Sequence, residues 1–148
     1  MQFIGVTAIL FAAAASATSV SYDLGYDEGG RAMTAVACSD GPNGMITKGY
    51  STQGSIPGFP NIGASSDIPG WNSDQCGQCF SLSYNGGAPL YAVAIDHAAN
   101  GWVLSKAAMN KLTNNQADFL GRVEATVSKV GVDKCGLTPS KRAITFNA

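Results

Sequence analysis

A set of four cysteines most narrows what this chain can fold into, and all of them follow residue 17: Cys38, Cys76, Cys79 and Cys135. The stretch before them, residues 1–17, carries no charged side chain and ends in Ala-Ser-Ala, a small-x-small pattern after which signal peptidases cut. Its apolar run is shorter than the about 20 residues that a membrane-spanning helix needs. We therefore predict that residues 1–17 are a signal peptide, and that residues 18–148 are one secreted domain, extracellular or in the cell wall, whose cysteines form disulfides.

The pairing of the cysteines stays open at this point, because four cysteines allow three connectivities. Cys76-Gly77-Gln78-Cys79 has the spacing of a thioredoxin-type redox pair, but that motif opens a helix in a βαβ unit, and here an alternating, strand-like pattern follows. A zinc site is also disfavoured, because Cys38 and Cys135 are isolated and an oxidising compartment favours disulfides. We favour the interpretation that Cys76 and Cys79 form disulfides with different cysteines.

The charge balance argues against one class of partner. Nine Lys and Arg residues stand against ten Asp and Glu residues, for a net charge of −1. Nucleic-acid binding draws much of its affinity from basic side chains that neutralise phosphates, so a chain without a basic excess is a poor candidate. Residues 18–148 contain no second long apolar run, and we expect no membrane anchor. We also expect neither a cofactor nor a metal site.

The periodicity of apolar residues predicts little helix and many short strands. Ser105 is a candidate N-cap for a helix over residues 106–112, and residues 116–120 add a short helical turn. Runs of β-formers between Gly, Asn and Pro predict strands at Val20–Tyr22, Met33–Cys38, Gly44–Lys48, Cys79–Tyr84, Leu90–Ile95, Val123–Val130 and Ala143–Phe146. This count favours a small closed β-barrel, with a two-sheet sandwich as the alternative.

The segment 52–74 contains three prolines and no clear strand, so we predict a long functional loop there. Its apolar residues, Trp71 among them, are expected to pack the loop down, and for Trp71 this role is favoured over sugar stacking. Trp102 fits a core role and a sugar-stacking role equally well. His97 is the only histidine of the chain, and without a Ser or Cys nucleophile beside it we interpret it as a polar surface residue.

Several short motifs follow one another in an order that resembles one family. In chain order they are Ser21-Tyr22-Asp23, Ala37-Cys38-Ser39-Asp40-Gly41, Pro57-Gly58-Phe59-Pro60-Asn61, Gly70-Trp71, Cys76-Gly77-Gln78-Cys79, Val93-Ala94-Ile95-Asp96 and Lys134-Cys135. Together they resemble the cerato-platanins, which are small secreted fungal proteins. The resemblance implies a mainly β, single-domain, six-stranded double-psi β-barrel with short helices, related to the first domain of expansins. It also implies that Cys38 pairs with Cys76 and Cys79 with Cys135.

The resemblance further implies a groove that binds carbohydrate. The residues predicted to bind it are Ser39, Asp40, Gly41, Gly77, Gln78, Asp96 and Asn100. Asp96 takes the place of the aspartate that faces the polysaccharide in expansin-like barrels, and a capping role toward the backbone of residues 98–101 is the alternative. For Asp40 the alternative is a turn role, because Asp-Gly-Pro is a turn sequence.

No catalytic residue is predicted, because glycoside hydrolysis normally needs two carboxyl groups at a defined separation. The candidates to partner Asp96 are Asp40, Asp67, Asp74 and Glu124, and the sequence gives no distance for any of them. The resemblance implies binding of chitin or N-acetylglucosamine oligomers, wall loosening without hydrolysis, self-association, and an elicitor or virulence role toward plants through a wall or receptor partner. The alternatives are an expansin-like or weak polysaccharide-degrading enzyme, and a self-assembling, surface-active wall protein.

Overall fold

The computed structural model describes residues 17–139, and within them six strands close into a barrel in the order β1-β5-β2-β4-β3-β6. The β1–β5 and β2–β4 pairs are parallel, and the other neighbours are antiparallel. The strands are β1 (Ala17–Tyr22), β2 (Ile62–Ser65), β3 (Cys79–Ser83), β4 (Leu90–His97), β5 (Trp102–Leu104) and β6 (Val123–Val130). The predicted six-stranded barrel with short helices is confirmed, and the sandwich alternative is wrong.

Like the shorter β2 beside it, strand β4 is largely buried. Its residues 92–95 are all buried, as the nearly continuous apolar run predicts. Strand β6 alternates buried and exposed residues at its start, so one of its faces meets water. At the core, the rings of Phe80 in β3 and Trp102 in β5 pack edge to face with their centroids 5.2 Å apart.

The predicted helix is present as α1 (Lys106–Thr113), followed by the short α2 (Ala117–Leu120). The Ser105 hydroxyl accepts the backbone N–H of Ala108, as expected for an N-cap. The carboxylate of Asp27, far away in sequence, accepts the backbone N–H groups of Lys106 and Ala107 at 2.7 and 3.0 Å. This second cap satisfies donors that a helix start leaves free, and no sequence pattern predicted it.

Two predicted strands are wrong, and two real ones were missed. Residues 33–38 form a 3-10 turn (Met33–Ala35) and irregular chain, and residues 44–48 form turns. Their apolar residues Met33, Val36 and Met45 are buried within loops, so burial there mimics a strand pattern. Strand β2 lies inside the segment predicted to lack strands, and β5 has only three residues. The predicted strand at Ala143–Phe146 lies outside the described residues.

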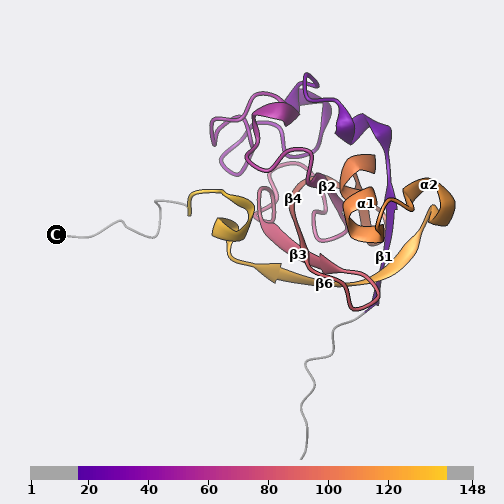
Figure 1. Ribbon diagram of the computed structural model, residues 1–148. Coiled ribbons are helices and arrows are strands. Elements are labelled where there is room, and N and C mark those ends of the chain that lie inside the picture. The colour runs from indigo at the N-terminus through magenta and orange to yellow at the C-terminus, as the bar shows by residue number, and fades with distance from the viewer. Residues whose placement is uncertain (1–16, 140–148) are drawn as a thin grey trace, which may run out of the picture.

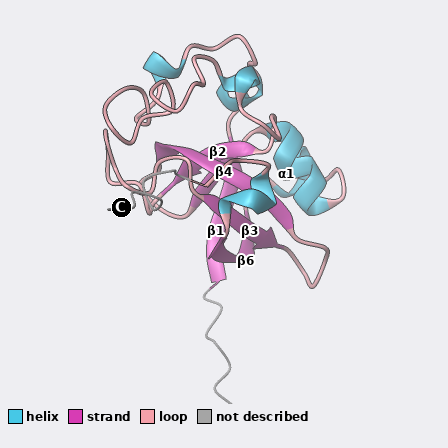
Figure 2. Cartoon of the chain, turned by 90° about the vertical axis from the view of Figure 1, so that its left-hand side faces the viewer, coloured by secondary structure: helices cyan, strands magenta, loops and turns pink. Residues whose placement is uncertain are grey.

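Long loops gather at one end of the barrel, and the helices lie beside it (Figures 1 and 2). Two disulfides tie this arrangement together: Cys38–Cys76 joins two loops, and Cys79–Cys135 joins β3 to the 3-10 turn Val132–Cys135. This is the pairing that the resemblance implied. The cysteines of the C-x-x-C motif therefore have different partners, and the redox-pair and zinc interpretations are wrong.

Candidate functional site

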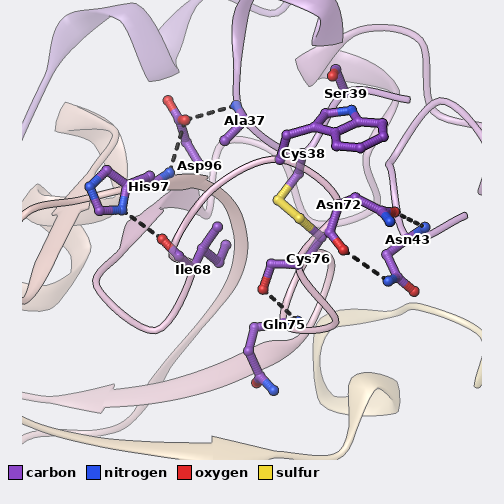
Figure 3. The surroundings of a disulfide bond; sticks show 12 residues. Ala37, Cys38, Ser39, Asn43, Ile68, Asn72, Gln75, Cys76, Asp96 and His97 are labelled. Carbon is purple, nitrogen blue, oxygen red and sulfur yellow. Dashed lines mark hydrogen bonds between the residues drawn. A yellow bond between two sulfur atoms is a disulfide. The ribbon is translucent and has the colours of Figure 1, made fainter. Parts of the chain in front are cut away.

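Asp96, near the end of β4, is a half-buried carboxylate held by three donors. Its Oδ1 accepts the backbone N–H groups of Ala37 and His97, each at 2.9 Å, and its Oδ2 accepts the Tyr26 hydroxyl at 2.8 Å. Figure 3 shows the two backbone contacts. The predicted alternative, a cap on the backbone of residues 98–101, is not what these contacts show. Asp96 instead links the barrel to two loops, and an ionised carboxylate with about four acceptor sites keeps capacity for one further donor.

The contact with Asp96 affects the pKa of the Tyr26 phenol. Burial raises the pKa of the Tyr26 phenol, and its hydrogen bond to the Asp96 carboxylate raises the pKa further. The phenol therefore stays protonated as a donor to Asp96 across the whole physiological range. All three groups that contact the Asp96 carboxylate are N–H or O–H donors, and none of them is a second carboxyl group.

Two loop segments flank the end of β4 on either side of the Cys38–Cys76 disulfide. The Cys38 N–H donates to the Ile95 carbonyl at 3.1 Å, which sets residues 37–38 beside the strand. The Gly77 N–H donates to the Ala94 carbonyl at 2.8 Å, and the Ala94 N–H donates to the Gln78 carbonyl at 3.1 Å. Residues 37–41, 77–78 and 96 are therefore neighbours, and we call them the Asp96 surface.

Gly77 cannot be replaced without disturbing this surface. Its φ of +77° lies in the left-handed region, and a Cβ there would stand 2.8 Å from the Lys48 Nζ and 3.0 Å from the Met45 Sδ. The Lys48 ammonium donates to the Cys76 carbonyl at 2.6 Å, and burial lowers the pKa of this lysine. Although Lys48 is exposed as a residue, its ammonium group therefore supports the backbone at the point where the 77–78 segment passes β4.

Asp40 lies at the outer end of the 37–41 segment and is exposed. Its Oδ1 accepts the indole N–H of Trp71 at 2.7 Å and the hydroxyl of Ser39 at 3.3 Å. The Trp71 hydrogen bond, more than any other contact, lowers the pKa of the Asp40 carboxyl. Trp71 itself is 61% exposed, so the prediction that it packs inward is wrong.

Asn100 and His97 are the next residues that the sequence analysis singled out. Asn100 lies on the exposed turn between β4 and β5, where Gly101 approaches the backbone of Ser19 and accepts the Ser66 N–H. These contacts bring the turn to β1 and to the loop after β2 instead of to residues 37–41 or 77–78. His97 is exposed, as predicted, and its Nδ1 donates to the Ile68 carbonyl at 2.6 Å.

Trp102 is a core residue that is 2% exposed, which decides between its two predicted roles. With Phe80 and Asp67 it borders a cavity of about 170 Å³. A second cavity, of about 230 Å³, is bordered by residues such as Pro57, Tyr91 and Lys134. None of the residues of the Asp96 surface borders either of these two cavities.

Two of the four candidate partners of Asp96 in hydrolysis have side-chain hydrogen bonds to other residues. Asp40 is bound to Trp71, and Asp74 accepts the side-chain amide of its neighbour Gln75. Asp67 borders the cavity beside Trp102, and Glu124 is exposed on β6, in register with Ser19 of β1. None of these four is among the groups that hydrogen-bond to the Asp96 carboxylate.

Sequence analysis missed Tyr26, Asn43 and Asn72. Tyr26 is 70 residues from Asp96, and no spacing rule joins the two. Asn72 binds Asn43 twice: its side-chain oxygen accepts the Asn43 N–H and its carbonyl accepts the Asn43 amide, each at 3.0 Å (Figure 3). Asn72 has a φ of +60°, a conformation that Asn adopts more readily than most residues, but this angle cannot be read from the sequence.

Comparison with known proteins defines the class. Residues 18–137 match the Cerato-platanin family, so the chain is a member of that family. In sequence it is 45% identical over 123 residues to the "Heat-stable 19 kDa antigen" of Coccidioides immitis, a match that spans 83% of this chain and 84% of the relative.

Two solved structures place the fold in the same family. Cerato-platanin 1 of M. perniciosa is 47% identical with a TM-score of 0.76, over 80% of this chain and 98% of that one. The fungal elicitor cerato-platanin is 34% identical with a TM-score of 0.72, over 79% of this chain and 95% of that one. The barrel described above is therefore the cerato-platanin barrel.

Within residues 17–139, no helix is both long and apolar enough to cross a lipid bilayer. In the same part of the chain, no three or more His, Cys, Asp or Glu side chains gather in a way that could hold a metal ion.

Proposed function

We propose that this protein is secreted, binds chitin or N-acetylglucosamine oligomers at the Asp96 surface, and does not cleave them. The observation that carries the proposal is the state of Asp96: half-buried, fixed by three donors, with no carboxyl group among its contacts. Around it lie backbone groups and small side chains of residues 37–41 and 77–78. Such groups suit sugar hydroxyls and N-acetyl amides, which exchange hydrogen bonds without a deep pocket.

The same contacts favour binding over bond cleavage. Retaining hydrolysis needs two carboxyl groups about 5–5.5 Å apart, and inverting hydrolysis needs about 6.5–9.5 Å with room for a water. The three groups that hydrogen-bond to the Asp96 carboxylate are N–H and O–H donors, and none of them is a carboxyl group that could serve as this partner.

An elicitor role and wall loosening are further parts of the proposal. One relative, the solved cerato-platanin of 34% identity, is described as a fungal elicitor. A protein that binds N-acetylglucosamine oligomers would either sequester wall fragments or separate polysaccharide chains by competing for their hydrogen bonds. Both effects need contact with glycan and neither needs hydrolysis.

The test is an NMR titration of the protein with chitin tetramer, beside a cello-oligomer control. The expected result is chemical-shift change at residues 36–41, 75–79 and 96–101 with the chitin oligomer. Asp96→Asn is the matched variant, because an amide retains the acceptor for Ala37 and His97 while it removes the charge. Loss of affinity in this variant, while a cooperative thermal transition shows that it is still folded, supports the site. Shifts confined to α1, or reducing sugar released from β-glucan by the wild type but not by Asp96→Asn, would contradict the proposal.

A specific observation also favours self-assembly as a second candidate function. Among the residues that the structure describes, three large apolar side chains are strongly exposed: Leu24, Trp71 and Phe119. Exposed apolar side chains drive adsorption to interfaces and association in water. Light scattering that grows with protein concentration, and that chitin oligomers neither promote nor dissolve, would support this function, whereas a monomer at all concentrations would contradict it.

A further inference from the structure

We propose that Trp71 is a fixed stacking platform for a pyranose ring, a second subsite that extends the Asp96 surface and makes binding depend on oligomer length. This inference rests on the proposed function, since it assumes that a glycan occupies the Asp96 surface. The sequence predicted that the Trp71 indole packs inward, but in the structure 61% of the residue is exposed.

The indole is exposed yet held in one orientation. Its only hydrogen-bonding group, the ring N–H, donates to the Asp40 carboxylate at 2.7 Å, a charge-assisted bond. The edge of the ring is therefore satisfied, and what remains for a ligand is an apolar face. A sugar ring presents an apolar surface of C–H groups and a polar rim, and it matches such a face bordered by the Ser39 hydroxyl and the Asp40 carboxylate.

The backbone beneath the ring fixes it further. A Cβ on Gly41 would stand 2.9 Å from the Trp71 Cζ2 and 2.9 Å from the Asn72 Oδ1, so the ring packs directly against the glycine. The φ of +80° at Gly41 also favours glycine there. Next to the ring, Asn72 binds Asn43 through two hydrogen bonds. A ring that is already ordered loses little conformational entropy when a ligand binds, which favours affinity.

The position of the ring relates it to Asp96. The segment that ends at Asp40, beside the indole, begins at Ala37, whose N–H donates to the Asp96 carboxylate. Three residues of chain span at most about 11 Å, so a single oligomer can reach from the Asp96 carboxylate to the indole. The ligand class is thus a pyranose oligomer, whose longer forms contact both groups.

Phe119 provides the contrast that makes the inference specific. It is 87% exposed on α2, more than Trp71, and a phenyl ring has no N–H with which to fix its edge. If exposure of an aromatic ring were enough for sugar binding, Phe119 would matter as much as Trp71. Phe119→Ala is therefore the matched control for Trp71→Ala.

The experiment measures affinity for chitin oligomers from dimer to hexamer by calorimetry, in the wild type, Trp71→Ala, Trp71→Phe and Phe119→Ala. We expect Trp71→Ala to weaken hexamer binding about tenfold, the scale of a buried aromatic anchor, and dimer binding less than about twofold. Trp71→Phe should recover part of the loss, and Phe119→Ala should bind as the wild type does. Melting temperatures confirm that each variant is folded.

Fluorescence gives an independent readout, because the chain has two tryptophans and one of them is buried. Hexamer should shift the wild-type emission to the blue and protect it from acrylamide, and Trp71→Phe, which leaves Trp102, should lose both effects. If Trp71→Ala binds the hexamer like the wild type, the subsite is overturned while the proposed function stands. If the wild type binds no chitin oligomer, the proposed function itself fails. Protection of Trp71 that rises with protein concentration alone would assign the ring to self-association and also overturn the subsite.

Discussion

The barrel and the loops at its end use the same residue type in opposite ways. Trp102 in β5 is 2% exposed and packs edge to face on Phe80, whereas Trp71 is 61% exposed and donates its N–H to Asp40. Both follow a glycine in the sequence. The contrast teaches that local sequence does not assign these aromatic rings: the barrel interior selects one for packing, and the loops present the other to solvent.

Truncation of each tryptophan ring should produce the largest difference between the barrel and the loops. Trp102→Ala should lower the free energy of unfolding by about 3–5 kcal/mol, because it leaves a cavity in the core. Trp71→Ala should lower it by less than about 1 kcal/mol, since an exposed ring contributes little packing. Chemical denaturation of both variants measures the difference. Equal losses would mean that the loops carry as much stability as the barrel.

A second test removes one disulfide at a time by paired Cys→Ser changes. The closed loops span 38 and 56 residues, and each bond should contribute about 3–4 kcal/mol in the chain-entropy view. Without Cys38–Cys76, hydrogen exchange should accelerate at residues 36–50 and 66–78 while the strands stay protected. Without Cys79–Cys135, the faster exchange should fall on β3 and residues 132–137. A uniform loss of protection in both variants would show that loops and barrel unfold together.

A third test asks how strongly Asp96 joins the loops to the barrel. Asp96→Ala leaves the Tyr26 hydroxyl and the Ala37 N–H without their acceptor, which should cost about 1–3 kcal/mol. Asp96→Asn retains an acceptor and should cost clearly less. Thermal melts compare the two variants. Should both melt like the wild type, Asp96 would not be the link that the geometry describes.

The smallest effect concerns pH at the loop end. The fold lowers the pKa of the Asp40 carboxyl below its ordinary value of 3.8, mainly through the Trp71 hydrogen bond. A lowered pKa means that the contact stabilises the fold above about pH 4 and is lost as the pH falls through the lower, folded value. Trp71 emission should therefore change below pH 3.8, and Asp40→Asn should abolish this step. An identical acid transition in Asp40→Asn would assign it to another group.

The sequence predicted the long, regular elements well and the short ones poorly. The helix after Ser105 and strands β3, β4 and β6 have enough residues to show their period. Strand β5 has three residues and β2 has four that are all buried, so neither shows alternation. Residues 33–38 and 44–48 look like strands because their apolar residues are buried, yet they lie in loops where turns satisfy the backbone.

The candidate site was also predicted in part: the motifs indicated some of its neighbouring segments, but not the side-chain contacts between distant residues. The resemblance of motifs placed Asp96 near residues 37–41 and 77–78, and the disulfide and the contacts to β4 bring those segments together. Nothing in the sequence joined Tyr26 to Asp96 or Trp71 to Asp40, 70 and 31 residues apart. Asn100, expected with them, lies on a turn that contacts β1 and Ser66.

By itself, the sequence determined the family, the disulfide-bonded class, the main strands and the helix cap, because these depend on residue type and local spacing. Only the tertiary structure decided which tryptophan is buried, which donors hold Asp96 and where Asp40 binds. Those outcomes depend on segments that are distant in the chain and adjacent after barrel closure, and local periodicity carries no information about such pairs.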